Sequence, residues 1–149
     1  MLLKEICTPD VVHCTRDTTV LEAARLMRTK HIGDLVVVDD PEEDRVPVGI
    51  VTDRDIVVEA LGNGLDPATT TVGRIMHSPV VIARESEDTA QAIERMRAHG
   101  VRRVPVVGHR GELIGIITLD DLLKKLAADA NALMDIVAKE QTQEHRARR

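Results

Sequence analysis

Two series of short apolar runs alternate with polar segments along this chain. Runs at 35–38 and 48–52 are followed, after a helical pattern and a polar stretch, by runs at 104–107 and 113–118. All four are rich in Val or Ile, which is typical of buried strands. The pattern therefore predicts two pairs of core strands.

The runs repeat with an almost constant spacing. Ile6 corresponds to Ile75 with an offset of 69 residues, whereas Gly49 corresponds to Gly115 with an offset of 66. The first copy thus has three extra residues in the acidic loop 39–45, which is predicted to be a solvent-facing hairpin tip. A fixed internal period indicates a duplicated structural unit.

An amphipathic helix is predicted near the start of each copy. Thr19 with Glu22, and Asp88 with Gln91, are capping-box pairs at matching positions. Helically spaced apolar residues follow each cap: Val20, Ala23, Ala24 and Met27 in the first copy, and Ala92, Ile93 and Met96 in the second. First strands are predicted near 11–14 and 80–83. We therefore predict an α/β (α+β) fold of two βαββα repeats that pack sheet to sheet about a pseudo-twofold axis.

The predicted boundaries place repeat 1 at 1–65, a linker at 66–74, repeat 2 at 75–128 and a C-terminal helix with a basic tail at 129–149. Apolar residues recur every three or four positions past the second repeat, at Leu122, Leu126, Ala130, Leu133 and Val137, with Leu123 and Met134 beside them. This pattern predicts an extended amphipathic helix. Packing on its own domain and contact with another subunit both remain open.

A repeated turn is the main candidate for chemistry. Both Gly49-Ile50-Val51-Thr52-Asp53-Arg54-Asp55 and Gly115-Ile116-Ile117-Thr118-Leu119-Asp120-Asp121 run from a strand into a helix. The first N–H groups of such a helix suit a phosphate, and an Asp one turn later offers acceptors for a ribose diol. Thr-x-x-Asp is also a capping pattern. Both interpretations can hold for one residue.

Composition narrows the function classes. The net charge of −5 argues against a nucleic-acid binder, and Phe, Tyr and Trp are all absent, so a base pocket would have to be aliphatic. Two cysteines and the absence of a long apolar run predict a cytoplasmic protein that does not enter the membrane. Cys7, His13 and Cys14 match no common zinc spacing, so no metal site is predicted. No nucleophile with a base is legible, so we predict no enzyme.

The duplicated unit, each copy closing on Gly-apolar-apolar-Thr-x-x-Asp, resembles a pair of CBS domains, a tandem also called a Bateman module. The resemblance extends from about Leu3 to about Ala127. The first turn is most similar to that of stand-alone bacterial CBS-pair proteins of the hypoxic-response type. The resemblance implies a regulatory module that binds AMP foremost, or ADP, ATP, NAD or S-adenosylmethionine, in a cleft between the repeats. It also implies a homodimer.

The resemblance further implies which residues bind the ligand. Asp55 and Asp121 would hold ribose, Thr52 and Thr118 would face phosphate, and the remaining contacts would come from Ile50, Ile116, Val12, Val81, Ile32, Gly33, Asp34, Val101, Arg102 and Arg103. Arg54 is a further candidate for phosphate. Arg102 and Arg103 replace Gly33 and Asp34 of the first copy, so unequal sites are expected; solvated surface arginines are the alternative. A second functional hypothesis is an interaction module with vestigial clefts.

Overall fold

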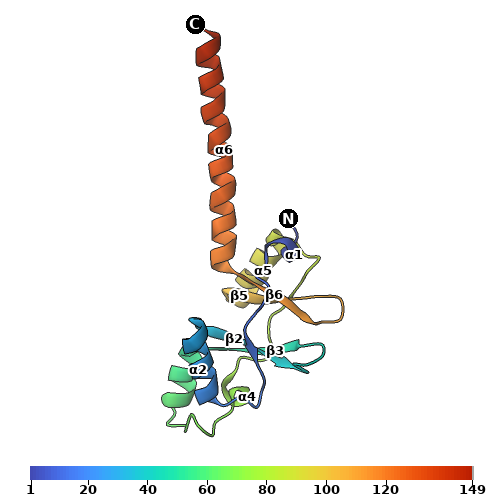
Figure 1. Cartoon of the computed structure of the whole chain (residues 1–149), viewed down its shortest axis with the longest axis vertical. Coiled ribbons are helices and arrows are strands. Elements are labelled where there is room, and N and C mark those ends of the chain that lie inside the picture. The colour runs from blue at the N-terminus through green and yellow to red at the C-terminus, as the bar shows by residue number, and fades with distance from the viewer. Residues whose placement is uncertain (149) are drawn as a thin grey trace. The chain divides into compact units, whose positions relative to one another are not determined.

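The computed structural model describes residues 1–148, and Arg149, at the end of the predicted basic tail, lies outside them. The chain divides into two units, Met1–Ile117 and Thr118–Arg149, which are treated separately below. The first unit contains nearly all of both repeats (Figure 1). The second consists of the helix α6 (Leu119–Ala147) and the residues that flank it.

The first repeat forms a mixed three-stranded sheet with the order β1-β2-β3. β1 (His13–Cys14) pairs in parallel with β2 (Asp34–Asp39), which pairs antiparallel with β3 (Val46–Thr52). The helix α2 (Val20–Lys30) connects β1 to β2. After β3 the chain enters the short helix α3 (Asp53–Asp55), which continues as the π-helix η1 (Ile56–Leu61).

The second repeat has the same order of elements. β4 (Ala83–Arg84), α5 (Thr89–His99), β5 (Arg103–Val107) and β6 (Leu113–Thr118) follow one another, and the sheet order is β4-β5-β6. The predicted βαββα unit is thus confirmed twice. The first strands are shorter than predicted, because only two residues of each pair with the next strand.

The predicted caps of the two equivalent helices are present. The Thr19 side chain accepts a hydrogen bond from the Glu22 N–H, and the Asp88 carboxylate accepts one from the Gln91 N–H. Both helices end on a left-handed residue, His31 at φ 56° and Gly100 at φ 64°. A non-glycine residue in this conformation is uncommon, so the His31 backbone is the more strained of the two ends.

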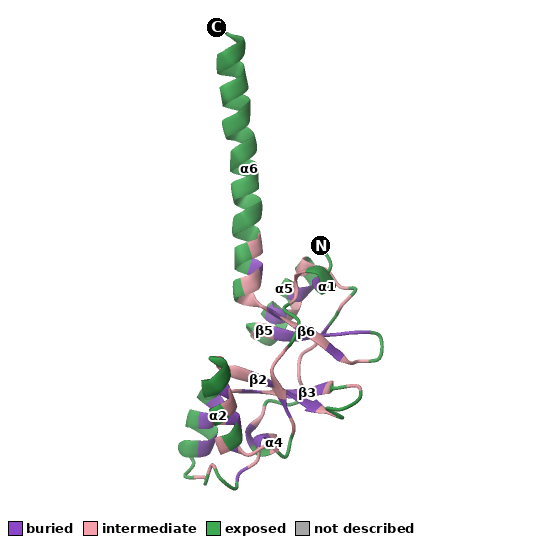
Figure 2. Ribbon diagram, in the orientation of Figure 1, coloured by how far each residue is buried: buried purple, intermediate pink, exposed green. Residues whose placement is uncertain are grey.

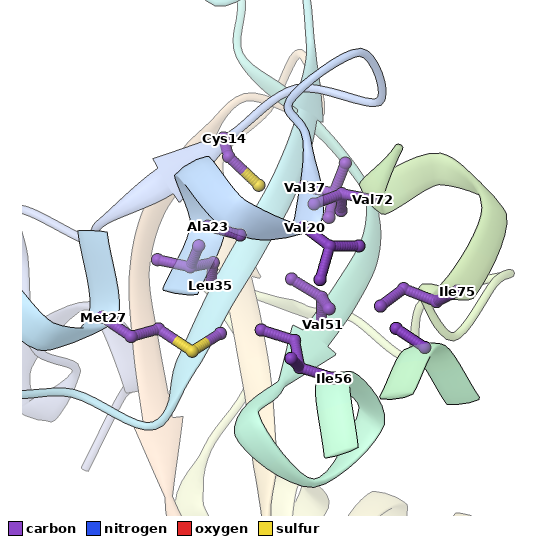
Figure 3. Close-up of a cluster of buried hydrophobic side chains, with 11 residues drawn as sticks. Cys14, Val20, Ala23, Met27, Leu35, Val37, Val51, Ile56, Val72 and Ile75 are labelled. Atoms are coloured by element: carbon purple, nitrogen blue, oxygen red, sulfur yellow. The ribbon is translucent and has the colours of Figure 1, made fainter. Parts of the chain in front are cut away.

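The core of the first repeat is a layer of aliphatic side chains between its helices and its sheet (Figure 3). Val20, Ala23 and Met27 of α2 face Leu35, Val37 and Val51 of the sheet, with Cys14, Ile56, Ala60, Val72 and Ile75 around them. The equivalent face of α5 buries Ala92 and Met96 but leaves Ile93 half exposed, contrary to the apolar face predicted for this helix.

Two short helices that the sequence pattern did not predict each contact the repeat that they do not precede. α1 (Leu3–Ile6) contacts the second repeat, where the Leu3 N–H donates to the Glu87 carbonyl at 2.8 Å. α4 (Val72–Ile75) contacts the first repeat, where the Val72 N–H donates to the Thr18 carbonyl at 2.7 Å. Figure 1 shows α1 beside α5, and α4 in the part of the unit that contains α2. Each repeat is therefore completed by a segment that precedes the other.

The two sheets meet through a second, smaller aliphatic cluster. Val36 and Val38 of β2 pack with Leu113 of β6, and Val11 and Ile116 border them. This cluster confirms that the repeats pack sheet to sheet. Because each sheet buries one face against its own helices and the other against the opposite sheet, neither repeat has a complete core alone.

The long helix α6 has few buried residues. Leu122 is buried near its start, whereas every described residue from Leu126 onward is exposed (Figure 2). The predicted C-terminal helix is thus present and continuous with the last helix of repeat 2. Among the described residues, no helix is both long and apolar enough to cross a membrane.

Candidate functional site

The first repeated turn is built as a reciprocal cap. The Thr52 hydroxyl accepts a hydrogen bond from the Asp55 N–H at 3.1 Å, and the Thr52 N–H donates to Asp55 Oδ2 at 2.8 Å. Asp55 is buried although it is a carboxylate. The capping interpretation is therefore confirmed for this turn, and it fixes the carboxylate at the point where β3 becomes a helix.

The first helical N–H groups of this turn already have partners within the protein. The Asp53 N–H donates to the Gly33 carbonyl at 2.9 Å, and the Arg54 N–H donates to Asp53 Oδ1 at 2.8 Å. Together with the capped Asp55, these bonds leave little capacity for an anion at the backbone. A phosphate at this turn would have to be held mainly by side chains, contrary to the interpretation of the helix start as a phosphate cradle.

A histidine from another part of the chain completes the environment of Asp55. His77 Nε2 lies 2.7 Å from Asp55 Oδ1, although the His77 side chain is 74% exposed. Backbone bonds between His77 and Ile50, of 3.2 and 2.9 Å, hold the segment after α4 against β3. Sequence reasoning missed His77, because the repeat offset does not show that this segment crosses β3.

Gly49 allows that crossing. A Cβ atom at Gly49 would lie 2.9 Å from the His77 carbonyl oxygen and 2.6 Å from Met76 Sδ. Gly115 has the same role in the second repeat, where a Cβ would lie 2.9 Å from the Thr8 carbonyl oxygen. The glycine that opens each repeated motif is therefore required by close backbone packing.

Asp34 connects the two repeats beside this turn. It lies opposite Thr52 in the β2–β3 register, and its Oδ1 lies 3.6 Å from Arg103 Nε of the second repeat. Burial raises the pKa of the Asp34 carboxyl, Arg103 opposes this rise, and the nearby negative charge of Asp53 adds to it. Arg103 is thus paired with a carboxylate and is not simply a solvated surface residue.

The second repeated turn has the same cap. The Thr118 N–H donates to Asp121 Oδ2 at 3.0 Å, and the Asp121 N–H donates to the Thr118 hydroxyl at 3.1 Å. Among the described residues, no hydrogen bond corresponds to the one between His77 and Asp55. Thr8, which occupies the position equivalent to His77, instead exchanges backbone bonds of 2.9 and 3.0 Å with Ile116. The two turns are therefore alike in backbone and different in side-chain partners.

The other predicted ligand residues lie near the ends of the same strands. Ile32 and Val101 are equivalent, and each N–H donates to the last turn of the preceding helix, at Met27 and Met96. Both are half-buried, as are Val12 and Val81, whereas Arg54 and Arg102 are exposed. In the first repeat, the structure brings Ile50, Thr52, Asp55, Gly33 and Asp34 together through the bonds described above.

A hollow of about 580 Å³ adjoins His77 on the η1 and α4 side. Its lining consists of Glu59, Asn63, Leu65, Arg74, Ile75, Met76 and His77, which includes none of the predicted ligand residues. The predicted site and this hollow are therefore separate features that share the neighbourhood of His77.

The part of the chain that the structure describes has two features that concern metal and thiol chemistry. No three of its His, Cys, Asp and Glu side chains are grouped so that they could hold a metal ion. Burial raises the pKa of the Cys14 thiol to about 11, although a hydrogen bond with Thr18 opposes the rise. Cys14 is therefore protonated at neutral pH and is a poor nucleophile.

Comparison with known proteins identifies the family. The CBS domain family matches residues 3–62 and 72–128, which cover both repeats. The chain belongs to the CBS domain family. It is a tandem pair of CBS domains.

Relatives and solved structures agree with this assignment. The chain is 35% identical to hypoxic response protein 1 of Mycobacterium tuberculosis over 128 residues, which cover 85% of this chain and 86% of that protein. It is also 35% identical to the uncharacterized protein MK0525 of Methanopyrus kandleri, over 80% of this chain but only 60% of that longer protein.

The CBS pair of protein MJ0100 has been solved with 5′-methylthioadenosine and S-adenosyl-L-methionine. It is 27% identical to this chain, with a TM-score of 0.74, and the match covers 87% of this chain and 98% of that one. That CBS pair therefore binds two adenosine-containing ligands.

Proposed function

We propose that this CBS pair is a non-catalytic sensor of an adenosine derivative, which it binds between its repeats and reports to a partner protein. The observation that carries the proposal is the buried Asp55 carboxylate at the end of β3. Its Oδ2 is held by the Thr52 N–H, and its Oδ1 is bonded by a histidine side chain that is largely exposed. A ribose hydroxyl can replace that exposed donor without disturbing the cap.

The surroundings of Asp55 bear on the class of adenosine derivative. The carboxylates of Asp34 and Asp53 flank the Thr52 turn, and Asp53 contributes to the raised pKa of Asp34. Arg103 of the second repeat is already paired with Asp34. Because the backbone N–H groups of this turn are also occupied, the first repeat favours a neutral or cationic adenosine derivative over AMP, ADP, ATP or NAD.

S-Adenosylmethionine and 5′-methylthioadenosine fit this description, since one is cationic and the other uncharged. This preference differs from the sequence-based prediction, which placed AMP first. The second repeat carries Arg102 and Arg103 at the positions of Gly33 and Asp34, so we propose that it tolerates a phosphate better. The homodimer and the cytoplasmic location predicted from the sequence remain parts of the proposal.

Isothermal titration with AMP, ATP, NAD, 5′-methylthioadenosine and S-adenosylmethionine tests the proposal. Asp55→Ala and Asp121→Ala should each remove charge-assisted bonds to ribose worth about 1.5–3 kcal/mol, roughly ten- to a hundredfold in affinity. Asp55→Asn is the matched variant, because its amide oxygen can still accept the Thr52 N–H. Unchanged affinity in both alanine variants would refute the assignment of the site.

Ligand binding should also stabilise the fold. A ligand at about a hundred times its Kd adds about 2.7 kcal/mol to the free energy of unfolding. The shift can be followed with an extrinsic dye, since the chain has no Trp or Tyr.

An interaction module with vestigial clefts is the second candidate. It is favoured by the caps, because Thr52, Asp55, Thr118 and Asp121 all make structural hydrogen bonds without any ligand. The same titrations separate the candidates, since an interaction module would bind none of the five compounds.

A further inference from the structure

The helix α6 carries an apolar stripe that the described part of the chain leaves uncovered. Six large apolar side chains are between 47% and 66% exposed on it: Leu123, Leu126, Leu133, Met134, Ile136 and Val137. Isolated helices are only marginally stable in water, and helices in proteins gain most of their stability from the packing of an apolar face. A contiguous exposed stripe of this kind marks an interaction surface.

The spacing of the stripe indicates the kind of partner. Four of these residues, Leu123, Leu126, Leu133 and Val137, form a seam with Leu119 and Ala130, in which the positions 119, 123, 126, 130, 133 and 137 are separated by alternating steps of four and three residues. Such a seam faces a single direction along a slightly supercoiled helix and is filled by the side chains of another helix. The stripe therefore suits a second α-helix along its whole length, roughly 27 Å for 18 residues.

The charge of α6 argues against a lipid surface as the partner. Helices that lie on membranes have a polar face rich in Lys and Arg. The described part of α6 and its cap carries six acids, Asp120, Asp121, Asp129, Asp135, Glu140 and Glu144, against five bases, Lys124, Lys125, Lys139, Arg146 and Arg148. Acidic and basic residues are interspersed, so an anionic bilayer gains no net attraction.

We propose that α6 pairs with α6 of a second copy of this chain in an antiparallel coiled coil centred near Ala128. When the seam is reversed about this residue, Leu126 faces the partner's Ala130, and the same contact recurs on the other side of the centre. Farther out, Leu123 faces the partner's Leu133 and Leu119 faces the partner's Val137. Every layer then contains at least one Leu and none contains two small residues.

The parallel alternative packs less well. It would place Ala130 against the partner's Ala130 and leave a void between two layers of paired leucines. Facing positions that alternate large and small side chains fill a helix interface at native density, and a void loses those contacts. The seam is therefore complementary to itself in the antiparallel direction.

The area of the stripe indicates how strongly the two helices should associate. A Leu-sized side chain buries roughly 60–120 Å² of apolar surface. The exposed fractions of the six residues in each of two copies therefore supply roughly 400–900 Å². When the polar area that accompanies apolar area in a homodimer interface is added, the total buried area is about 700–1,300 Å², at the lower limit for stable complexes. The pairing should therefore depend on protein concentration.

Disulfide trapping in the full chain tests the orientation. Leu126→Cys and Ala130→Cys are prepared separately, then mixed, oxidised and mapped by mass spectrometry of the tryptic peptides. Antiparallel pairing predicts the disulfide between the unlike variants in the mixture and little disulfide through either new cysteine alone. Disulfides formed within each preparation, or none at either position, would overturn the proposal.

Sedimentation velocity over a concentration series tests the interface itself. Leu126→Asp with Leu133→Asp should weaken self-association at least tenfold, whereas Asn131→Asp, which lies outside the seam, should leave it unchanged. Circular dichroism verifies that the first unit is still folded. Equal self-association of all three proteins, or a chain that stays monomeric at high concentration, would overturn the proposal. Ligand titration of the same variants tests the proposed function separately from self-association, because no predicted ligand residue is altered.

Discussion

Asp34 and Arg103 occupy equivalent positions in the two repeats and form an ion pair with each other, with 3.6 Å between Oδ1 and Nε. Their offset is the same 69 residues that relates Val37 to Val106. A pseudo-twofold axis brings equivalent positions together, and here the two copies have diverged to opposite charges. The divergence that predicts unequal ligand sites therefore also joins the repeats.

Replacing Arg103 with Gln should destabilise the fold at neutral pH by about 1 kcal/mol, because the partly buried Asp34 loses its counter-ion. The pKa of Asp34 is raised above its ordinary 3.8, so the folded state binds this proton more tightly than the unfolded chain. Stability from this group is thus greatest below about pH 3.8 and declines as the pH rises through the raised pKa. Arg103→Gln raises that pKa further, so its cost should appear only above about pH 3.8.

Urea unfolding followed by far-ultraviolet circular dichroism, at pH 3.5 and pH 7, measures this difference. Asp34→Asn completes a double-mutant cycle and should abolish the effect of the Arg103 change. The same loss at both pH values, or in the Asp34→Asn background, would show that the pair has no electrostatic role.

The caps give a second prediction. Thr52→Ala and Thr118→Ala each remove the hydroxyl that accepts an Asp N–H at 3.1 Å, which should lower the free energy of unfolding by about 1 kcal/mol. Thr29→Ala is the control, because its exposed hydroxyl bonds only the Arg25 carbonyl within α2. Thermal or urea unfolding should rank both cap variants below the control, and a similar stability for all three would contradict the capping role.

His77 gives a third prediction, on ligand affinity. His77→Ala frees Asp55 Oδ1 for a ribose hydroxyl. Because the histidine of this pair is largely exposed, the pair is worth about 0.2–1 kcal/mol, and affinity at this site should rise roughly one- to fivefold. His109→Ala, which removes a 92% exposed side chain elsewhere, should have no effect. Titration with 5′-methylthioadenosine measures both variants. A lower affinity in His77→Ala would mean that the imidazole binds the ligand instead of competing with it.

Gly49 gives a fourth prediction. Gly49→Ala places a Cβ 2.9 Å from the His77 carbonyl oxygen, and this overpacking should cost about 1–3 kcal/mol. Adding Met76→Ala removes the contact with Sδ but not the contact with the backbone, so it should not restore the lost stability. Unfolding curves of the single and double variants measure this difference in stability. Full recovery of the free energy of unfolding in the double variant would contradict a backbone cause.

Local patterns predicted much of this fold, and contacts between distant segments account for what they missed. The caps at Thr19 and Asp88, the strands and the repeated turns are encoded within a few residues, so the sequence reveals them. α1 and α4 are only four residues each and are stabilised by contacts with the opposite repeat, which no local pattern reports. His77 escaped notice for the same reason, since its partner Asp55 is 22 residues away.

The helix start shows a different limit. Gly-apolar-apolar-Thr-x-x-Asp predicted an outward set of N–H groups, yet the Gly33 carbonyl and the Asp53 carboxylate occupy two of them. Whether a donor at a helix start is open depends on the loop beside it, and the pairing of that loop is a tertiary contact. The ribose-binding role of Asp55 and Asp121 stays a prediction for the titrations to test.

Because α1 and α4 each pack on the opposite repeat, the two halves of the chain are not two separable proteins. A fragment that ends near residue 66 keeps α1, which packs on the second repeat, and lacks α4, which packs on the first repeat. Either fragment alone should expose bare valine-rich strands and precipitate. The two expressed together should reassemble, so the module lends itself to a split reporter whose recovery depends on its ligand.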